Sequence, residues 1–389
     1  MPNRERPTWI ELDYTAAAHN IRRLCAIAGV PVMAVVKANA YGHGAVPFAH
    51  TALAHGATML AVATVGEARM LREAAITAPI MILGYTPPWQ AAEAVALGLT
   101  CAVYDMDVAR ALAEAATAQG RSVAVHVKVD TGMNRLGIST LAPDDAGTFL
   151  RALSDLPGLS VEGLFTHFAT ADEANERYAR VQLARFRALL KAVTAAGLRP
   201  PIVHAANSAA TLRFPDARFD MVRPGIAGYG LHASPDTPLP ADFRPVLTLH
   251  TELAQVKPVP ADMPLSYGCT FVTRRPSVIA TLPVGYADGV RRVPPWREVL
   301  LHGRRAPIVG RICMDYLMID ITEIAADLPV QRGDTVTLIG AQVDPRTGHQ
   351  ERITAEEVAG WLGTINYEVT SGLMARVPRV GQGAIKAPA

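Results

Sequence analysis

The sequence has little lysine, few aromatic residues and almost no net charge. Of its 37 basic residues only five are lysine, at positions 37, 128, 191, 257 and 386, so the place of each lysine is informative. Aromatic residues make up 6% of the 389 residues and the formal net charge is +2. This balance argues against a basic surface that binds nucleic acid.

Cysteine is also scarce and scattered. The four cysteines form no CxxC pair and have no histidine at metal-ligand spacing; they are Cys25, Cys101, Cys269 and Cys313. We therefore expect neither a disulfide framework nor a metal site. A reducing, cytoplasmic setting is the natural interpretation.

Several sequence patterns are missing. No apolar run reaches the ~18 residues that a membrane span requires, and the charged Arg4, Glu5 and Arg6 are not typical of a secretory signal. There is no GxxxxGK[ST] motif, and the glycines of 41–44 do not complete GxGxxG. These absences argue against a membrane protein, a P-loop enzyme and a Rossmann dehydrogenase.

What the sequence does contain is an alternation of short β-branched runs with helical stretches. Hydrophobic residues make up 50% of the chain, enough for a large core. This alternation predicts βαβ units and a parallel sheet. Eight strand candidates favour an N-terminal (β/α)8 TIM-like barrel that ends near Gly230; they are 30–37, 59–64, 79–84, 99–104, 123–130, 161–168, 202–207 and 221–223.

The pattern changes after a proline-rich stretch at 234–245. Strand-like segments separated by Gly, Pro and Asp turns predict a C-terminal, mostly β-strand domain with one late helix from Thr354; they are 246–256, 277–282, 306–312, 316–319 and 335–339. We predict a strand at 1–12, a barrel at 13–240 and the β domain at 241–389. The sequence alone leaves open whether the first strand joins the C-terminal domain.

Lys37 is the first candidate for chemistry. It ends the apolar run 34–36 and precedes a loop punctuated by Gly42 and Gly44, which places its amine at the C-terminal mouth of a barrel strand. A lysine held against apolar surroundings has a lowered pKa and can form a Schiff base with an aldehyde. The alternative is an ordinary lysine at the end of a strand that reaches solvent.

Candidate phosphate contacts follow the seventh and eighth strands. Barrels commonly bind phosphate with these two loops. Ser208 would begin a helix after the seventh strand, and Gly225 follows the eighth. A serine at the start of a helix is, however, most often only a cap.

Other polar residues fall at the ends of predicted strands. The alternation of 123–130 places Lys128 inside the barrel, where an ammonium needs a partner such as Asp130 or chemical modification. His167 ends the sixth strand, and Tyr286 lies on a tight loop in the second domain. The alternatives are a lysine paired with a strand carboxylate, a satisfied core histidine and a packing tyrosine.

Six motifs together resemble those of the alanine racemase family, in the family's order and across nearly the whole chain. They are AVVKANAYGHG at 34–44, VKVDTGMNRLG at 127–137, HAANS at 204–208, MVRPGIAGYG at 221–230, LPVGYADG at 282–289 and GRICMD at 310–315. Six motifs in register are far more specific than any one of them.

The resemblance implies a fold-type III enzyme that uses pyridoxal 5'-phosphate and works as a head-to-tail homodimer with shared active sites. Its implied activity is interconversion of L-alanine and D-alanine, which supplies D-alanine for peptidoglycan. Lys37 resembles the lysine that holds the cofactor and acts as the base toward D-alanine. Tyr286 resembles the opposing base, which enters from the partner subunit. One group cannot serve both faces of a planar carbanion, so two bases are needed.

Further roles are implied by the same resemblance. Arg223 resembles the arginine that faces the pyridine nitrogen of the cofactor. His167 resembles a histidine beside the cofactor that forms a hydrogen bond with the catalytic tyrosine. Arg135 and Met314 match substrate-binding positions, and Lys128 matches a lysine that many members carry as N6-carboxylysine. The residues that resemble phosphate contacts are Tyr41, Ser208, Gly225, Ile226 and Tyr367.

Three alternatives remain at this level. One is a racemase of broader specificity, for alanine and serine, on the same scaffold. Another is a fold-type III decarboxylase, which would need different motifs in the second domain. The third is a non-catalytic pyridoxal phosphate carrier, which would lack the second domain. One departure is Gly228, where relatives often have a larger apolar residue, and it puts local packing in doubt.

Overall fold

The computed structural model describes residues 5–140 and 143–383. It divides into two compact units. The barrel unit spans Ala16–Arg244, and the C-terminal unit combines the described parts of Met1–Thr15 and Pro245–Ala384. Each unit has its own sheet, so the two are described separately.

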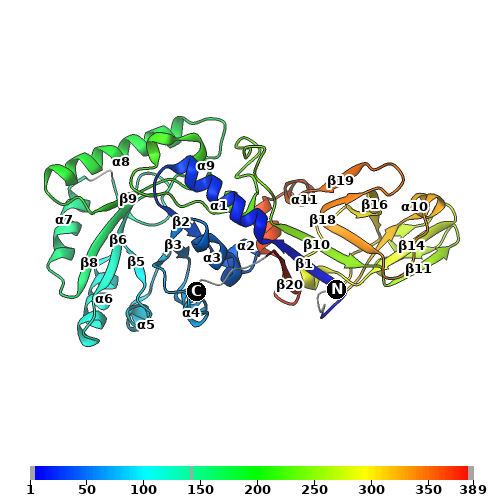
Figure 1. Ribbon diagram of the computed structural model, residues 1–389, viewed down its shortest axis with the longest axis horizontal. Helices are drawn as coiled ribbons and strands as arrows, with labels where there is room; N and C mark the ends of the chain where they lie inside the picture. The colour runs from blue at the N-terminus through cyan, green and yellow to red at the C-terminus, as the bar shows by residue number, and fades with distance from the viewer. Residues whose placement is uncertain (1–4, 141–142, 384–389) are drawn as a thin grey trace. The chain divides into compact units, whose positions relative to one another are not determined.

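Parallel strands form the sheet of the barrel unit, and helices cover its outside (Figure 1). The strand order is β2-β3-β4-β5-β6-β8-β9, with β7 paired to β6. The strands are β2 Val32–Val35, β3 Ala57–Val62, β4 Ile80–Ile82, β5 Thr100–Val103, β6 Val123–Asp130, β7 Ile138–Ser139, β8 Leu159–Phe165 and β9 Ile202–His204. The helices are α2 Lys37–Tyr41, α3 Ala45–Ala54, α4 Val65–Glu73, α5 Ala91–Ala96, α6 Met106–Ala118, α7 Pro143–Ser154, α8 Arg177–Ala195 and α9 Ser208–Arg213, with short 3-10 turns at Pro88–Gln90, Pro215–Ala217 and Ile226–Tyr229.

The barrel closes without a full eighth strand. The segment predicted as that strand, 221–223, makes isolated parallel bridges instead, from Met221 to His204 and from Val222 to Val32. The amide of Met33 donates to the carbonyl of Val222 at 2.9 Å. The prediction of a barrel is confirmed, but its last strand is reduced to two bridges because Pro224 follows at once and has no N–H to extend the ladder.

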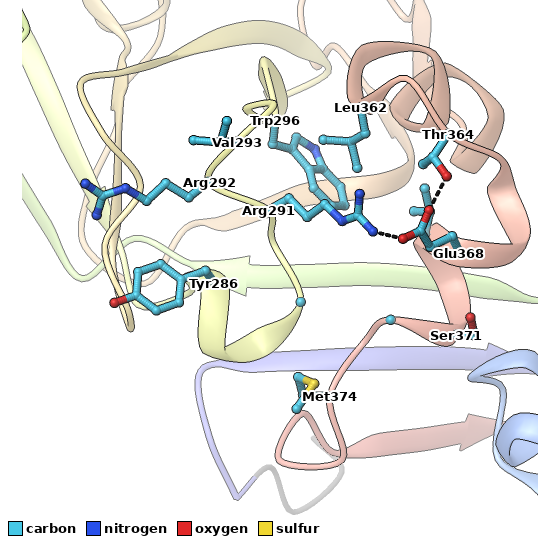
Figure 2. Close-up of a pocket in the computed structure, with 13 residues that line it drawn as sticks. Tyr286, Arg291, Arg292, Val293, Trp296, Leu362, Thr364, Glu368, Ser371 and Met374 are labelled. Carbon is cyan, nitrogen blue, oxygen red and sulfur yellow. Dashed lines mark hydrogen bonds and ion pairs between the residues drawn. The ribbon is translucent and has the colours of Figure 1, made fainter.

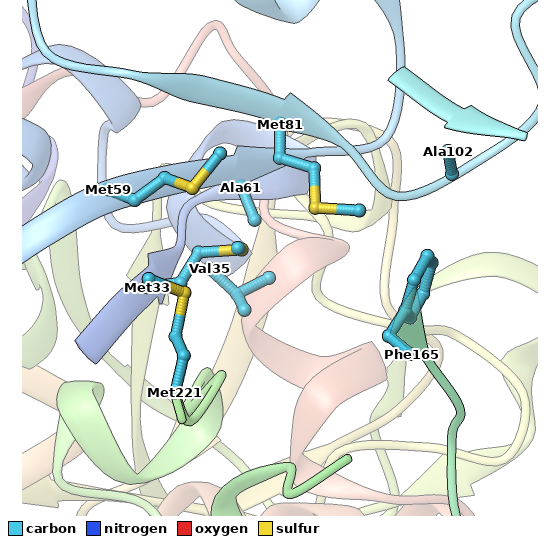
Figure 3. Packing of buried hydrophobic residues seen from close by; sticks show 8 residues of the cluster. All are labelled: Met33, Val35, Met59, Ala61, Met81, Ala102, Phe165 and Met221. Atoms are coloured by element: carbon cyan, nitrogen blue, oxygen red, sulfur yellow. The ribbon is translucent and has the colours of Figure 1, made fainter. Parts of the chain in front are cut away.

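Alternate residues of the strands fill the barrel interior. Met33 and Val35 of β2, Met59 and Ala61 of β3 and Phe165 of β8 belong to one buried cluster, and their side chains face one another between the strands (Figure 3). The other members are Met81, Ala102 and Met221. Flexible methionines can fill an irregular space that branched side chains would leave partly empty. This packed layer supports the strand ends that carry the polar residues.

The C-terminal unit consists mostly of β-strands, as predicted, and the structure shows that their pairing is mostly antiparallel. Its order is β11-β14-β17-β16-β15-β18-β10-β1-β20, with β19 paired to β18 and a separate β12-β13 pair. The strands are β1 Thr8–Asp13, β10 Leu247–Glu252, β11 Gln255–Val259, β12 Pro264–Leu265, β13 Phe271–Val272, β14 Ser277–Leu282, β15 Glu298–Leu301, β16 Arg304–Val309, β17 Leu317–Asp320, β18 Thr335–Val343, β19 Gln350–Ile353 and β20 Arg379–Gln382. Helix α1 Tyr14–Ala28 follows β1 and lies in the barrel unit from Ala16 onward. The C-terminal unit also contains α10 Thr322–Asp327, α11 Ala355–Leu362, α12 Asn366–Ser371 and the 3-10 turns Tyr267–Cys269 and Tyr286–Asp288.

Two details of this unit differ from the sequence prediction. The first strand pairs with β10, antiparallel, and with β20, parallel, which answers the question that the sequence left open. The prediction of a single late helix was wrong, because α10 and α12 are present besides α11. Both are only six residues long, too short for a helical period to be distinguished in sequence.

Candidate active site

Lys37 lies where the carboxyl end of β2 turns into α2. Burial of the side chain lowers the pKa of Lys37, the nearby Arg135 lowers it further, and the carboxylate of Glu67 opposes both. An amine with a lowered pKa spends more time unprotonated, and only the unprotonated amine is a nucleophile. The position and the electrostatics are those that the sequence predicts for this lysine.

The chain after Lys37 adopts a left-handed turn without using glycine. Ala38, Asn39, Ala40 and Tyr41 have φ values between 52° and 54°, and the amide of Gly42 donates to the carbonyl of Ala38 at 3.0 Å. A left-handed residue with a Cβ costs roughly 1–2 kcal/mol. Four in succession persist only where neighbouring groups hold them, and such strain gathers at functional sites.

A cavity of about 300 Å³ opens beside Lys37 within the barrel unit. Five basic side chains line it, together with apolar groups such as Leu83 and Phe165; the basic residues are Lys37, Lys128, Arg135, His167 and Arg223. No carboxylate is among the described residues that line it. A cavity with such a lining suits an anionic ligand.

Arg223 is held rigidly in this cavity. It is 3% exposed and donates to the Thr166 carbonyl at 2.9 Å and the Ala205 carbonyl at 3.0 Å. It also contacts His204 Nδ1 at 2.7 Å and His167 Nδ1 at 3.2 Å. Burial lowers the pKa of Arg223 to about 9, so the guanidinium keeps its charge at neutral pH.

The charge of Arg223 determines the hydrogen positions on the histidines around it. A guanidinium only donates, so Nδ1 of His204 and Nδ1 of His167 accept. His204 then carries its hydrogen on Nε2 and donates it to Nδ1 of His126 at 2.7 Å. Burial, with Arg223 next, lowers the pKa of all three imidazoles, that of His126 to about 4. The result is a neutral chain of rings that orients the arginine.

The two predicted phosphate loops meet each other. Ser208 Oγ accepts from the amide of Gly225 at 2.9 Å and from that of Ala227 at 3.3 Å, and Ile226 begins the following 3-10 turn. A Cβ on Gly225 would come within 2.7 Å of Tyr41 Oη. Close approach of the tyrosine therefore requires glycine here. The structure thus brings together four of the predicted phosphate contacts.

Gly228, the departure noted in the sequence, has room for one more methyl group. A Cβ there would meet Ile21 at 3.4 Å and Phe48 at 3.5 Å, which is ordinary contact. We expect Gly228→Ala to raise the free energy of unfolding by about 0.4–1 kcal/mol, because alanine restricts the unfolded chain without strain. Urea denaturation measures this. Gly225→Ala is the control and should destabilise; a destabilised Gly228→Ala would contradict the packing described.

Lys128 points into the barrel, as the alternation of β6 predicts, and is 6% exposed. Its Nζ lies 4.6 Å from the centre of the Phe165 ring. Burial lowers the pKa of Lys128 to about 7, with Arg223 and Arg135 adding to the effect and Asp130 opposing it. Asp130 instead accepts from the backbone amides of Gly132 and Asn134. Lys128 is therefore an amine that is partly neutral at physiological pH.

Tyr286 and Met314 lie together in the C-terminal unit. The Tyr286 amide donates to the Cys313 carbonyl at 3.1 Å, and the Ala287 amide donates to the Met314 carbonyl at 3.0 Å. A Cβ at Gly285 would meet the Cys313 carbonyl oxygen at 2.3 Å, so this approach depends on glycine. Tyr286 is 40% exposed.

A cavity of about 750 Å³ adjoins Tyr286 in the same unit. The Tyr286 hydroxyl is directed away from the Arg291–Glu368 ion pair at the other end (Figure 2). Tyr367, a predicted phosphate contact, lies in α12 and is half-buried. It belongs to the C-terminal unit, whereas Ser208 and Gly225 belong to the barrel unit.

Sequence reasoning missed a second exposed tyrosine near Cys313. Tyr267 is 64% exposed and follows Ser266, whose φ of 64° and ψ of −176° are strained for a residue with a side chain. Ser266 Oγ donates to the Arg311 carbonyl at 2.5 Å and lies 3.5 Å from Cys313 Sγ. The signal was the Tyr267-Gly268 pair, a tyrosine on a tight loop like Tyr286-Ala287.

Metal ligands and membrane spans are not found in the described chain. Across residues 5–140 and 143–383, no three His, Cys, Asp or Glu side chains gather as metal ligands. None of the helices in the described part of the chain is long and apolar enough to cross a membrane. The candidate chemistry rests on the basic cavity and the two tyrosines.

Comparison with known proteins decides the family. Residues 12–233 match the family described as Alanine racemase, N-terminal domain, and residues 246–381 match Alanine racemase, C-terminal domain. The chain belongs to the alanine racemase family. It is 46% identical to the alanine racemase of Desulfovibrio desulfuricans over 97% of this chain and 98% of that one. The alanine racemase of Symbiobacterium thermophilum is 48% identical over 96% of this chain and 97% of its own.

Solved structures agree with this assignment. The Bacillus anthracis alanine racemase with bound L-Ala-P superposes with a TM-score of 0.89 at 41% identity, covering 98% of this chain and 96% of that one. A histidine racemase from Leuconostoc mesenteroides subsp. sake reaches a TM-score of 0.88 at 29% identity, covering 98% and 99%. The architecture is therefore shared by racemases named for different amino acids, and of these two the alanine racemase has the higher identity to this chain.

Proposed function

We propose that this chain interconverts L-alanine and D-alanine with pyridoxal 5'-phosphate, using Lys37 and a tyrosine as opposed bases. The observation that carries the proposal is the cavity where the Lys37 amine meets Arg223, Arg135 and His167, with no carboxylate in its described lining. When bound, the cofactor supplies an electron sink that makes the Cα proton of the amino acid removable. Every other task falls to the residues of the chain.

The residues present fit this cofactor. Lys37 offers an amine of lowered pKa, and an amine must be unprotonated to form a Schiff base with the aldehyde of the cofactor. Tyr41, Ser208, Gly225 and Ile226 would hold the phosphate in the barrel unit, and Tyr367 is proposed as a further phosphate contact. Gly225 lacks the Cβ that would push Tyr41 away. The basic lining matches the negative charge of a phosphate and a carboxylate.

Arg223 and His167 would act on the ring of the cofactor. We infer that Arg223 faces the pyridine nitrogen, where a cation that only donates disfavours ring protonation. The carbonyls of Thr166 and Ala205 and the ring of His204 fix the direction of its guanidinium. His167, kept neutral by burial and by Arg223, would contact the catalytic tyrosine. Arg135 would bind the carboxylate of the substrate, and Met314 is proposed as a further substrate-binding residue.

Two tyrosines of the C-terminal unit are candidates for the base toward L-alanine. Tyr286 is the residue to which the motif resemblance pointed. Tyr267 flanks the same 311–314 segment, presents more of its phenol to solvent and follows the strained Ser266. Because backbone strain concentrates at functional groups, this observation favours Tyr267. We therefore propose Tyr267 as the base and keep Tyr286 as the alternative.

The proposal extends to assembly and setting. We infer a homodimer in which the tyrosine is contributed by the partner subunit, working in the cytoplasm to supply D-alanine for the cell wall. The cysteines support a reducing setting, since all four are free thiols in the described residues. The two competing functions have less support. A carrier would lack the C-terminal domain that residues 246–381 match, and broader specificity rests on the histidine racemase likeness alone.

Lys128 is proposed as an N6-carboxylysine that holds Arg135. The neutral amine adds carbon dioxide to form a carbamate anion and releases one proton. In buffer free of carbon dioxide, the stability of the protein should rise between pH 7 and pH 10, because the unfolded chain keeps the lysine proton to higher pH than the folded one, whose Lys128 pKa is about 7. For every pH unit that separates the lysine pKa of the folded chain from that of the unfolded chain, the free energy of unfolding changes by about 1.4 kcal/mol.

Bicarbonate should increase the free energy of unfolding at pH 7–8, because a carbamate replaces the buried ammonium of Lys128. Lys128→Met should abolish both the rise of stability with pH and the response to bicarbonate. The measurement is the free energy of unfolding in urea at each pH, together with a 13C spectrum after labelling with 13C-bicarbonate. A wild-type protein with no carbamate resonance and no response to bicarbonate would reject the modification.

Borohydride trapping tests the proposed function directly. The purified protein with pyridoxal phosphate should show an absorption band in the visible range and lose this band when borohydride reduces it. The reduced cofactor should then be attached, as a covalent label, to the peptide that contains Lys37. Lys128 offers an internal comparison in the same cavity. Label on Lys128, or on any lysine other than Lys37, would overturn the assignment.

A further inference from the structure

Glu67 contacts the left-handed turn from the neighbouring helix. Its Oε1 accepts from the amide of Ala38 at 2.7 Å. Its Oε2 accepts from the amide of Ala63 at 2.7 Å and from that of Thr64 at 3.3 Å. One carboxylate thus joins three segments: the turn after Lys37, the end of β3 and the start of α4.

This arrangement exceeds what a helix cap needs. In a capping box the N-cap and the N3 side chain bond each other's backbone amides, and Thr64 and Glu67 do so, both at 3.3 Å. The two bonds of 2.7 Å go elsewhere, to Ala38 and Ala63. The closer contacts of the carboxylate are therefore made to Ala63, which lines the Lys37 cavity, and to Ala38, the residue after Lys37, rather than to the cap.

The turn needs such a support on physical grounds. Its first left-handed residue is Ala38, whose Cβ makes φ of 52° unfavourable. The next residue of the turn is held by a bond to the chain that follows, because Asn39 Oδ1 accepts from the Ala45 amide at 2.8 Å. Glu67 holds the end nearest Lys37, and its charge is also close enough to oppose the lowering of the Lys37 pKa.

We propose that Glu67 is a positioning residue that fixes the left-handed turn 38–41 and thereby aims the Lys37 amine and the Tyr41 phenol at the cofactor. The inference rests on the proposed function, since it deepens the role of Lys37. Glu67 itself is not among the described residues that line the Lys37 cavity. Its effect passes through the backbone of Ala38, so it should be visible in the backbone as well as in cofactor retention.

The test compares three variants of the cofactor-loaded enzyme. Glu67→Ala removes all three bonds of the carboxylate, and Glu67→Gln keeps one acceptor. Thr64→Ala weakens the same helix cap by removing the bond from the Glu67 amide to Thr64 Oγ, and it leaves the Glu67 carboxylate in place. Hydrogen exchange of peptides that cover 37–44 reports the turn, and the visible band after dilution reports release of pyridoxal phosphate. Thermal unfolding of each variant shows whether it is folded.

Glu67→Ala should speed both amide exchange in 38–42 and release of pyridoxal phosphate by roughly tenfold, the scale of a lost bond to a charged acceptor. Glu67→Gln should fall between, and Thr64→Ala should resemble the wild type in both readouts. Equal values for Glu67→Ala and Thr64→Ala would overturn the proposal. Failure of the proposed function would show separately, as wild-type protein that borohydride does not label at Lys37.

Discussion

Replacing Lys37 with alanine should lower the rate of alanine racemisation by roughly 10,000-fold or more, the upper range for removal of a general base. The variant loses both the amine that anchors the cofactor and the base toward D-alanine. Its visible absorption should vanish. The barrel should still fold, because Lys37 follows the packed layer of β2 and is only half-buried.

The control is another lysine of the same unit. Lys191 lies exposed on α8, so Lys191→Ala should leave the rate and the spectrum unchanged. Racemisation is followed by chiral chromatography, and folding is followed by thermal unfolding. A Lys37→Ala enzyme that retains more than about a hundredth of the wild-type rate would contradict the assigned role of this lysine.

Replacing Tyr267 with phenylalanine should impair proton transfer on the L face of the substrate and leave proton transfer by Lys37 on the D face intact. Without its phenol, delivery and removal of the proton on the L face should slow by roughly 100-fold to 10,000-fold. Lys37 would still exchange the Cα hydrogen of D-alanine with deuterium from solvent. We therefore expect exchange of D-alanine without its conversion to L-alanine, measured by mass spectrometry and chiral chromatography in heavy water.

The comparison with Tyr286→Phe decides between the two tyrosines. Tyr316 is 51% exposed in the same unit, and Tyr316→Phe provides a control for loss of an exposed phenol. If Tyr286→Phe shows the asymmetry and Tyr267→Phe does not, Tyr286 is the base and the strain argument is wrong. If neither variant shows it, the two-base account itself fails.

The barrel could be predicted from sequence because each strand is a short apolar run, which can be recognised from the local sequence without knowing the strands it pairs with. Lys37 could be placed because it ends one of these apolar runs, and Lys128 because strand alternation fixes which face of a strand a residue occupies. The closing segment is harder, because Met221 and Val222 make only isolated bridges. Such pairing depends on strands far away in the sequence.

The support around the site could not be predicted. Ala38 to Tyr41 contain no glycine, so nothing in their sequence indicates a left-handed turn. Glu67 reads as part of a capping box, and its contact with Ala38 spans 29 positions. The His126–His204 contact spans 78 positions. The Tyr267-Gly268 pair is visible in the sequence, but the strained backbone at Ser266 that singles it out is seen only in the coordinates.

One measurement tests the central claim most directly: incubation of the cofactor-loaded protein with each enantiomer of alanine in heavy water, with serine, lysine and arginine run in parallel. The account predicts equal amounts of L-alanine and D-alanine from either starting enantiomer, with one deuterium at Cα of the inverted product and alanine converted fastest. No inversion of alanine, or faster inversion of another of these amino acids, would contradict it.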